Sequence, residues 1–237
     1  MGQDRRGPVQ LPLELALAPR FGREHFLKAP SNAAALAMVE RWPDWPDRLL
    51  TLIGPAGSGK SHLLAIFAAR SQALVPDPAR LPTPAELSAA APGAVALDGL
   101  DRIGDETALF HLLNFAVEHG VFVLMAARRP PTAATVLLPD LLSRLRRAPM
   151  VEIGAPDDAL MRAVLEKLFR DRQLAVEPPA LAYAALRLER SLEAARVFVA
   201  TLDRAALAQR RPVTRALAAE VIEAMDGREA GADPATE

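Results

Sequence analysis

The first two thirds of the chain alternate between short apolar runs and longer stretches with helix signals. The apolar runs predict strands buried on both faces, because they show little polar alternation; they lie at residues 49–53, 94–98, 121–125 and 150–153. One helix is predicted to open at Ser31, a good N-cap, a second to run from Lys60 to about Arg70, and a third to lie between the second and third strands. Strands alternating with helices predict a parallel sheet covered on both faces, so the expected fold class is α/β.

After residue 154 the strand runs stop and apolar residues recur at helical spacing. Leu160, Val164 and Leu168 lie four residues apart, behind Asp157-Asp158 at an expected helix start. Later helices are expected to open at Pro178-Pro179, at Ser191 and at Thr214. The last of them is expected to end before Gly227. This pattern predicts a small all-helical domain behind the sheet domain.

The change of pattern divides the chain into four parts. The predicted organisation is an extended, Pro-punctuated arm at 1–20, a P-loop sheet domain at 21–154, a helical domain at 155–226 and a polar tail at 227–237. Residues 71–93 lie inside the sheet domain, but they are rich in Pro and Ala and predict no clear element.

The strongest chemical signal is a motif between the first predicted strand and the helix that follows it. It fits the pattern G-x-x-x-x-G-K-[ST] at every position: Gly54, Pro55, Ala56, Gly57, Ser58, Gly59, Lys60 and Ser61. The glycines let backbone N–H groups turn inward around a phosphate, and the helix N-terminus adds its dipole. Lys60 would reach the terminal phosphates and Ser61 would ligate Mg²⁺. The motif predicts a site for ADP or ATP with Mg²⁺.

An acidic residue at the end of the next predicted strand completes the expected metal site. Asp98 fits the element that holds Mg²⁺ through water. Hydrolytic enzymes of this type usually place a second carboxylate next to it to deprotonate the attacking water, and here that residue is Gly99. Asp101 is two residues further on and is not expected to occupy the same point. The site is expected to bind a nucleotide and to hydrolyse it feebly.

Composition narrows the classes of function. The 28 basic and 29 acidic side chains give a net charge of −1, which argues against a broad basic surface for nucleic acid. The absence of cysteine excludes a disulfide scaffold, a thiolate zinc site and a cysteine nucleophile, and the four histidines show no ligand spacing. No apolar run approaches the roughly 18 residues of a membrane span. The start also lacks an apolar signal core, so a cytoplasmic location is expected.

The residues around the phosphate loop resemble a known family. Gly59-Lys60-Ser61-His62-Leu63-Leu64 is similar to the bacterial replication initiator DnaA and its relatives, in which a His and two Leu commonly follow the loop. Phe26-Leu27 and Ser31-Asn32 before an Ala-rich helix resemble the segment that lines the adenine pocket of that family. The resemblance covers residues 21–226 and implies an AAA+ module, with a five-stranded P-loop domain and a helical lid. His62 then belongs to the nucleotide site, while residues 71–93 fit the family's second strand poorly.

Two arginines match functional positions of this family. Residues 138–145, Leu-Pro-Asp-Leu-Leu-Ser-Arg-Leu, resemble its box VII, which places Arg144 at the arginine-finger position. Residues 189–193, Glu-Arg-Ser-Leu-Glu, resemble the sensor 2 motif on the lid, which makes Arg190 the arginine that faces the nucleotide. Arg146 and Arg147 are interpreted as surface arginines. The sensor 1 region at 125–131 departs from the family, because it has alanines where a polar residue often lies near the γ-phosphate.

The N-terminal arm carries a further resemblance. Residues 10–15, Gln-Leu-Pro-Leu-Glu-Leu, are similar to the short peptide by which regulatory members of the family bind the sliding clamp of DNA polymerase. Leu11, Leu13 and Leu15 would enter pockets while Gln10 makes polar contacts; an N-terminal edge strand is the alternative. The sequence also ends after the lid, where the initiator continues into a DNA-binding domain, and this favours the regulatory members.

The resemblance implies a regulator of DNA replication initiation. Such a protein would bind ADP, dock on DNA-loaded sliding clamp and present Arg144 to ATP bound in its partner, the initiator DnaA. It would meet DNA only through the clamp, would not need a membrane, and its own ATPase activity is expected to be weak or absent; dimer formation stays open. A working ATPase such as a helicase loader and a nucleotide-stabilised scaffold without a finger stay open as alternatives. A small-molecule kinase would explain neither Arg190 nor the Gln10 peptide.

Overall fold

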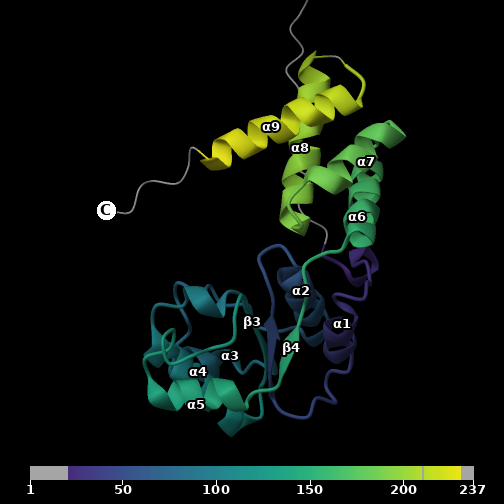
Figure 1. The fold of residues 1–237 in the computed structure, drawn as a ribbon. Coiled ribbons are helices and arrows are strands. Elements are labelled where there is room, and N and C mark those ends of the chain that lie inside the picture. Colours follow the sequence, from purple (N-terminus) through teal and green to yellow (C-terminus); the bar gives the residue numbers. More distant parts are fainter. Residues whose placement is uncertain (1–20, 210, 231–237) are drawn as a thin grey trace, which may run out of the picture.

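The computed structural model describes residues 21–209 and 211–230, which form a sheet domain and a helical lid (Figure 1). Within these residues the sheet has four strands: β1 Leu49–Ile53, β2 Ala94–Leu97, β3 Phe122–Ala127 and β4 Met150–Glu152. Neighbouring strands pair in parallel in the order β2-β3-β1-β4, with Leu52 opposite both Ala126 and Val151. The predicted strands and the α/β class are confirmed.

Helices cover both faces of the sheet, so each strand contributes alternate residues to two cores. One face packs against α1 Ala33–Glu40 and α2 Lys60–Ser71. That core contains Leu36, Leu50, Leu52, Phe67, Ala96 and Leu124. The other face packs against α3 Pro84–Ala90, α4 Glu106–His119 and α5 Pro139–Arg147. That core contains Leu49, Leu87, Val95, Leu112, Val123 and Leu141. Burial on both faces is why the strands are continuous apolar runs in the sequence.

The fifth strand that the resemblance implies does not form in the segment after α2. A single bridge stands in its place: the Leu74 N–H donates to Ala94 O at 2.9 Å, and the Ala96 N–H donates to Leu74 O at 2.8 Å. The residues that follow include Pro76, Pro78 and Pro82. Because proline has no N–H to donate to a ladder, pairing with β2 stops after this bridge.

The lid has a core of its own. It comprises α6 Asp158–Asp171, α7 Pro178–Arg187, α8 Leu192–Gln209 and α9 Arg215–Ala230. Its fully buried side chains include Leu165, Phe198 and Leu217. The expected helix openings are confirmed, because side-chain oxygens of Asp157, Ser191 and Thr214 accept backbone N–H groups of the helices that follow. Figure 1 shows the lid standing above the sheet domain, joined to it by the extended segment after β4.

Two helix ends differ from the prediction. α1 begins at Ala33, so Ser31 is not its N-cap. Asn32 fixes the preceding turn instead, because its side chain accepts the Ala29 N–H at 2.9 Å and donates to Leu27 O at 3.0 Å. α9 continues through Gly227, since one glycine inside a helix costs only about 1 kcal/mol. No helix within the described residues has the length and apolar character that crossing a bilayer requires.

Candidate nucleotide-binding site

The phosphate-loop motif lies between the end of β1 and the start of α2. Gly57 and Gly59 have φ angles of +67° and +107°, in the left-handed region that residues with a Cβ rarely adopt. The Gly54 N–H donates to Ala127 O of β3 at 3.2 Å, which fixes the start of the loop to the sheet. The N-terminus of α2, where backbone N–H groups have no partner within the helix, follows the loop directly. Such a loop can hold phosphates.

Lys60 lies inside the loop and bonds to it. The residue is 9% exposed, and its Nζ donates to Gly54 O at 2.7 Å and to Pro55 O at 2.6 Å. Burial lowers the pKa of the ammonium group, while the carboxylates of Asp98 and Asp101 oppose that shift. The carbonyl oxygens satisfy its N–H donors without cancelling its charge. Lys60 is therefore placed and charged to bind an anionic phosphate.

The two residues predicted to hold Mg²⁺ are in contact. The Ser61 Oγ donates to Asp98 Oδ2 at 2.6 Å, joining the start of α2 to the end of β2. A hydroxyl and a carboxylate are hard oxygen ligands, and Mg²⁺ usually takes few protein ligands and completes its shell with phosphates and water. The pair therefore fits Mg²⁺. Among the described residues no group of three or more His, Cys, Asp or Glu could hold a metal by itself.

The position beside Asp98 is a glycine, and the nearest acidic neighbour points elsewhere. Gly99 has a φ angle of +75°. The Asp101 carboxylate binds the end of β3: its Oδ1 accepts the Arg128 N–H at 3.1 Å, and its Oδ2 lies 3.6 Å from Arg128 Nε. The two alanines before Arg128 are buried in β3. Asp101 is therefore tied to Arg128 after β3 and does not replace a carboxylate at position 99.

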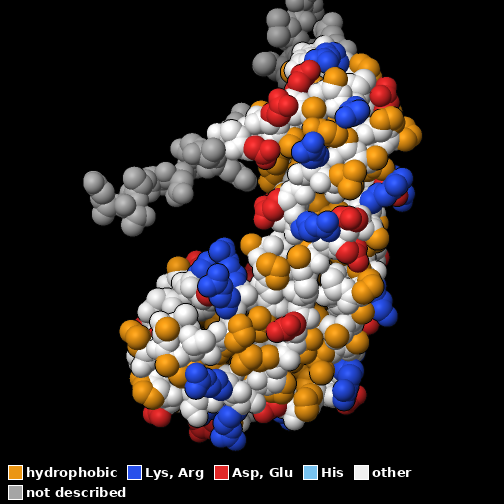
Figure 2. Space-filling model, viewed as in Figure 1, with side chains coloured by type: hydrophobic (Ala, Val, Ile, Leu, Met, Phe, Trp, Pro, Cys, Tyr) orange, Lys and Arg blue, Asp and Glu red, His pale blue; other side chains and the backbone are white. Residues whose placement is uncertain are grey.

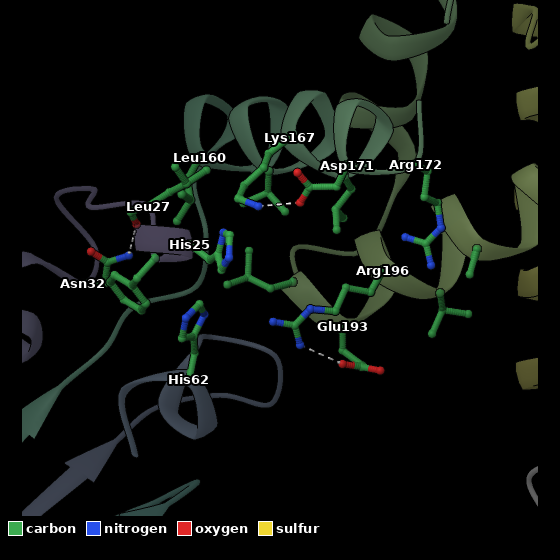
Figure 3. Close-up of a pocket in the computed structure, with 16 residues that line it drawn as sticks. His25, Leu27, Asn32, His62, Leu160, Lys167, Asp171, Arg172, Glu193 and Arg196 are labelled. Atoms are coloured by element: carbon green, nitrogen blue, oxygen red, sulfur yellow. Dashed lines mark hydrogen bonds and ion pairs between the residues drawn. The ribbon is translucent and has the colours of Figure 1, made fainter. Parts of the chain in front are cut away.

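A pocket of about 330 Å³ opens beside the loop, between the sheet domain and the lid (Figure 3). It is lined by the segment before α1, by His62 of α2, and by facing sides of α6 and α8. Phe26, Leu27 and Asn32, which the resemblance assigns to an adenine pocket, all line it. Sequence reasoning missed its lid side, formed by Leu160, Val164, Leu168, Leu192 and Arg196. The four-residue spacing of the α6 members was the available signal for that wall.

Arg190 lies two residues before α8 and makes an ion pair within the lid. Its Nη2 is 2.8 Å from Asp158 Oδ1, and both side chains are more than half exposed. The lid reaches the phosphate loop through the next two residues. The Leu192 N–H donates to Gly57 O at 2.9 Å, and Ser191 is buried against Gly57. Sequence reasoning placed Arg190 in the site and missed this backbone contact.

Arg144 lies on α5 and packs against α4. Its guanidinium is 5.8 Å from the centre of the Phe110 ring, and Nη1 lies 3.5 Å from Leu113 O. The residue is partly exposed, whereas Arg146 and Arg147 are exposed. Figure 2 shows basic side chains at the lower edge of the sheet domain, where Figure 1 places α5, and a separate basic group beside the hollow under the lid. The peptide residues Gln10, Leu11, Leu13 and Leu15 lie outside the described residues.

The fold is a parallel α/β sheet domain that carries a phosphate-loop motif and is followed by a helical lid, and several solved structures share this architecture. Domain III of the replication initiation protein DnaA from Thermotoga maritima is similar, with a TM-score of 0.70 and 17% identity over 87% of this chain and 97% of that chain. The RuvB Holliday junction branch migration motor of the same organism is also similar, with a TM-score of 0.67 and 16% identity over 86% of this chain and 72% of that chain. AMPPCP-bound DnaA from Aquifex aeolicus has a TM-score of 0.61 and 16% identity over 79% of this chain and 66% of that chain. No protein-family model and no curated protein matches the sequence.

Proposed function

We propose that this protein is a nucleotide-binding regulator of DNA replication initiation, of the kind represented by Hda, the regulator that inactivates DnaA. The likeness to DnaA domain III supports the replication context. One observation carries the proposal: the loop offers Lys60 and the Ser61–Asp98 pair to a nucleotide, beside a glycine where a hydrolytic site has its base. Such a site retains its nucleotide, and ADP is the proposed ligand.

The nucleotide would bind across both domains. Backbone N–H groups of the loop and of the first turn of α2 would bind the phosphates, with Lys60 beside them. Ser61 would hold Mg²⁺ directly and Asp98 through water, and the ion would neutralise phosphate charge. The base would enter the pocket between Phe26 and the lid. With Asp101 bound to Arg128, the chain's own hydrolysis would be weak.

Arg144 is proposed to act on ATP bound in a DnaA partner. An arginine supplied in trans neutralises charge in the transition state and is worth about 10³–10⁵ in rate. The contacts of Arg144 with Leu113 and Phe110 are long, so they orient the guanidinium without neutralising it. The basic last turn of α5 adds a positive field that suits a phosphate partner.

The N-terminal peptide is proposed to bring the protein to DNA. Its residues Gln10, Leu11, Leu13 and Leu15 would bind the sliding clamp, since alternate side chains of an extended peptide can fill a row of pockets. A chain of net charge −1 would then reach DNA through the clamp and not through a basic surface of its own.

The test measures hydrolysis of DnaA-bound ATP on clamp-loaded DNA. Wild-type protein should accelerate it, and Arg144→Ala should lower the stimulated rate by about 10³-fold. Arg147→Ala, on the same helix and exposed, is the matched control and should stimulate like the wild type. Equal stimulation by the wild type and Arg144→Ala would rule out Arg144 as an arginine finger. Replacing Gln10, Leu13 and Leu15 by Ala should abolish clamp pull-down, and unchanged pull-down would remove the tether.

A working ATPase, such as a helicase loader, is the second candidate. The likeness to the RuvB motor and the Ser61–Asp98 pair favour it. Steady-state turnover of about one per second by the isolated protein would establish it in place of the regulator. If the protein binds a nucleotide without turnover, and Arg144→Ala has no effect, the remaining function is that of a nucleotide-stabilised scaffold.

A further inference from the structure

His62 enters the pocket from the first turn of α2. The residue is 7% exposed, and Figure 3 shows its ring projecting into the pocket on the side where His25 lies. The rings of Phe21 and Phe26 meet it edge to face, with centroids 5.4 and 5.1 Å away. These contacts fix the plane of the imidazole, so each ring nitrogen has a defined direction.

The surroundings of His62 also fix its proton. Nε2 lies 3.1 Å from Gly22 O, and a carbonyl oxygen can only accept, so Nε2 carries the hydrogen. A histidine is ordinarily neutral at physiological pH, and in a neutral imidazole a hydrogen on Nε2 leaves Nδ1 as an acceptor.

Among the residues that the structure describes, the hydrogen bond of His62 is made by Nε2, and none is made by Nδ1. The polar side chains nearby are occupied. Asn32 uses both ends of its amide on Ala29 and Leu27, and in the lid Lys167 pairs with Asp171 and Arg196 with Glu193. A ligand that fills the pocket must offer Nδ1 a hydrogen-bond donor. Without a donor, the acceptor would lose its hydration, and no hydrogen bond would compensate for that loss.

We propose that Nδ1 of His62 accepts a hydrogen bond from the 6-amino group of adenine, so that His62 selects adenine over purines that lack this amine. A 6-oxopurine would place a carbonyl oxygen against Nδ1, leaving two acceptors face to face. A site built to bond a ligand N–H rejects an analogue without it, because its own buried group is left unpaired. This inference rests on the proposed function, since it needs a nucleotide base in the pocket.

The test compares three diphosphates that share ribose and phosphates: ADP, IDP and purine riboside diphosphate. Each displaces a ribose-labelled fluorescent ADP from the full chain, so phosphate-loop contributions cancel in the ratio of affinities. The wild type should prefer ADP by about tenfold or more, as one buried hydrogen bond provides. His62→Gln keeps a donor for Gly22 O and removes the acceptor at the Nδ1 position, so the preference should fall below about twofold. His62→Asn places an amide oxygen near the Nδ1 position and should keep it.

The outcomes separate this inference from the proposed function. No binding of any of the three nucleotides to the wild type would overturn the proposed function and this inference with it. Binding of ADP without preference, or a preference unchanged in His62→Gln, would overturn the role of His62 and leave the proposed function standing. The affinity for IDP should rise in His62→Gln, because the acceptor that faces its carbonyl oxygen is gone, and a cooperative thermal unfolding transition serves as the check that the variant is folded.

Discussion

A methyl group at Gly57 tests whether the lid rests on the phosphate loop. An ideal Cβ there would lie 1.9 Å from Ser191 Oγ, 2.8 Å from Ser191 Cβ and 3.1 Å from Ser191 Cα. Rotation of the hydroxyl can relieve only the first contact, so the start of α8 would have to move. The φ angle of +67° adds strain for any residue with a Cβ, of about 1–2 kcal/mol.

The structure gives the expected magnitude. Gly57→Ala should lower the free energy of unfolding by about 2–3 kcal/mol, because backbone strain adds to the loss of the hydrogen bond from Leu192, worth about 1 kcal/mol. Ser191→Gly alone should cost a few tenths of a kcal/mol, since glycine is a tolerated N-cap. The double variant removes the atoms that clash. It should be more stable than the sum of the single effects by about 1 kcal/mol.

Urea unfolding of the four proteins measures this coupling, and hydrogen exchange at the Leu192 amide localises it. Gly57→Ala should speed exchange at Leu192, and adding Ser191→Gly should slow it again. Effects that add within about 0.5 kcal/mol would mean that the two residues do not touch in solution, and the reasoning would fail.

Two further predictions concern protons and the metal. Because burial lowers the pKa of His62 below its ordinary 6.5, the unfolded chain binds more protons than the folded one as pH falls through 6.5. The free energy of unfolding should therefore fall between pH 7 and 5. In thermal unfolding, His62→Gln should show a smaller fall over this range than the wild type. An equal fall in the two proteins would assign the effect to other groups. Ser61→Ala should abolish the fall in ADP affinity that EDTA causes in the wild type, and an unchanged EDTA effect in titrations would place the ion elsewhere.

The fold could be predicted from the sequence where burial is simple. Leu49–Ile53 is buried on both faces, and such a strand is a continuous apolar run. The stretch at 71–93 could not be predicted, because one bridge at Leu74 and the short α3 depend on where prolines interrupt pairing with β2. The extension of α9 beyond Gly227 was missed because the small cost of one glycine does not by itself end a helix.

The same distinction applies to the candidate site: positions fixed within one domain could be predicted from the sequence, and contacts that depend on the lid could not. Lys60, Ser61 and Asp98 were placed because the motif and the strand end fix them within one domain. The pair between Arg190 and Asp158 and the contact of Leu192 with Gly57 depend on how the lid sits on the sheet domain. That angle is set by packing between distant segments, which no local pattern encodes.

The contact between Gly57 and Leu192 also bears on the bound nucleotide. A phosphate requires N–H groups of the loop to turn inward, and in each such peptide the carbonyl oxygen points the opposite way, unlike Gly54 O and Pro55 O, which accept from Lys60. The Leu192 N–H binds one such oxygen, so the docked lid favours the loop conformation that a phosphate favours. Linkage makes this reciprocal, because a bound phosphate must stabilise the docked lid by the same free energy. A regulator that retains its nucleotide would therefore keep its lid docked, with the angle between the domains held at the loop itself and not only through Arg190.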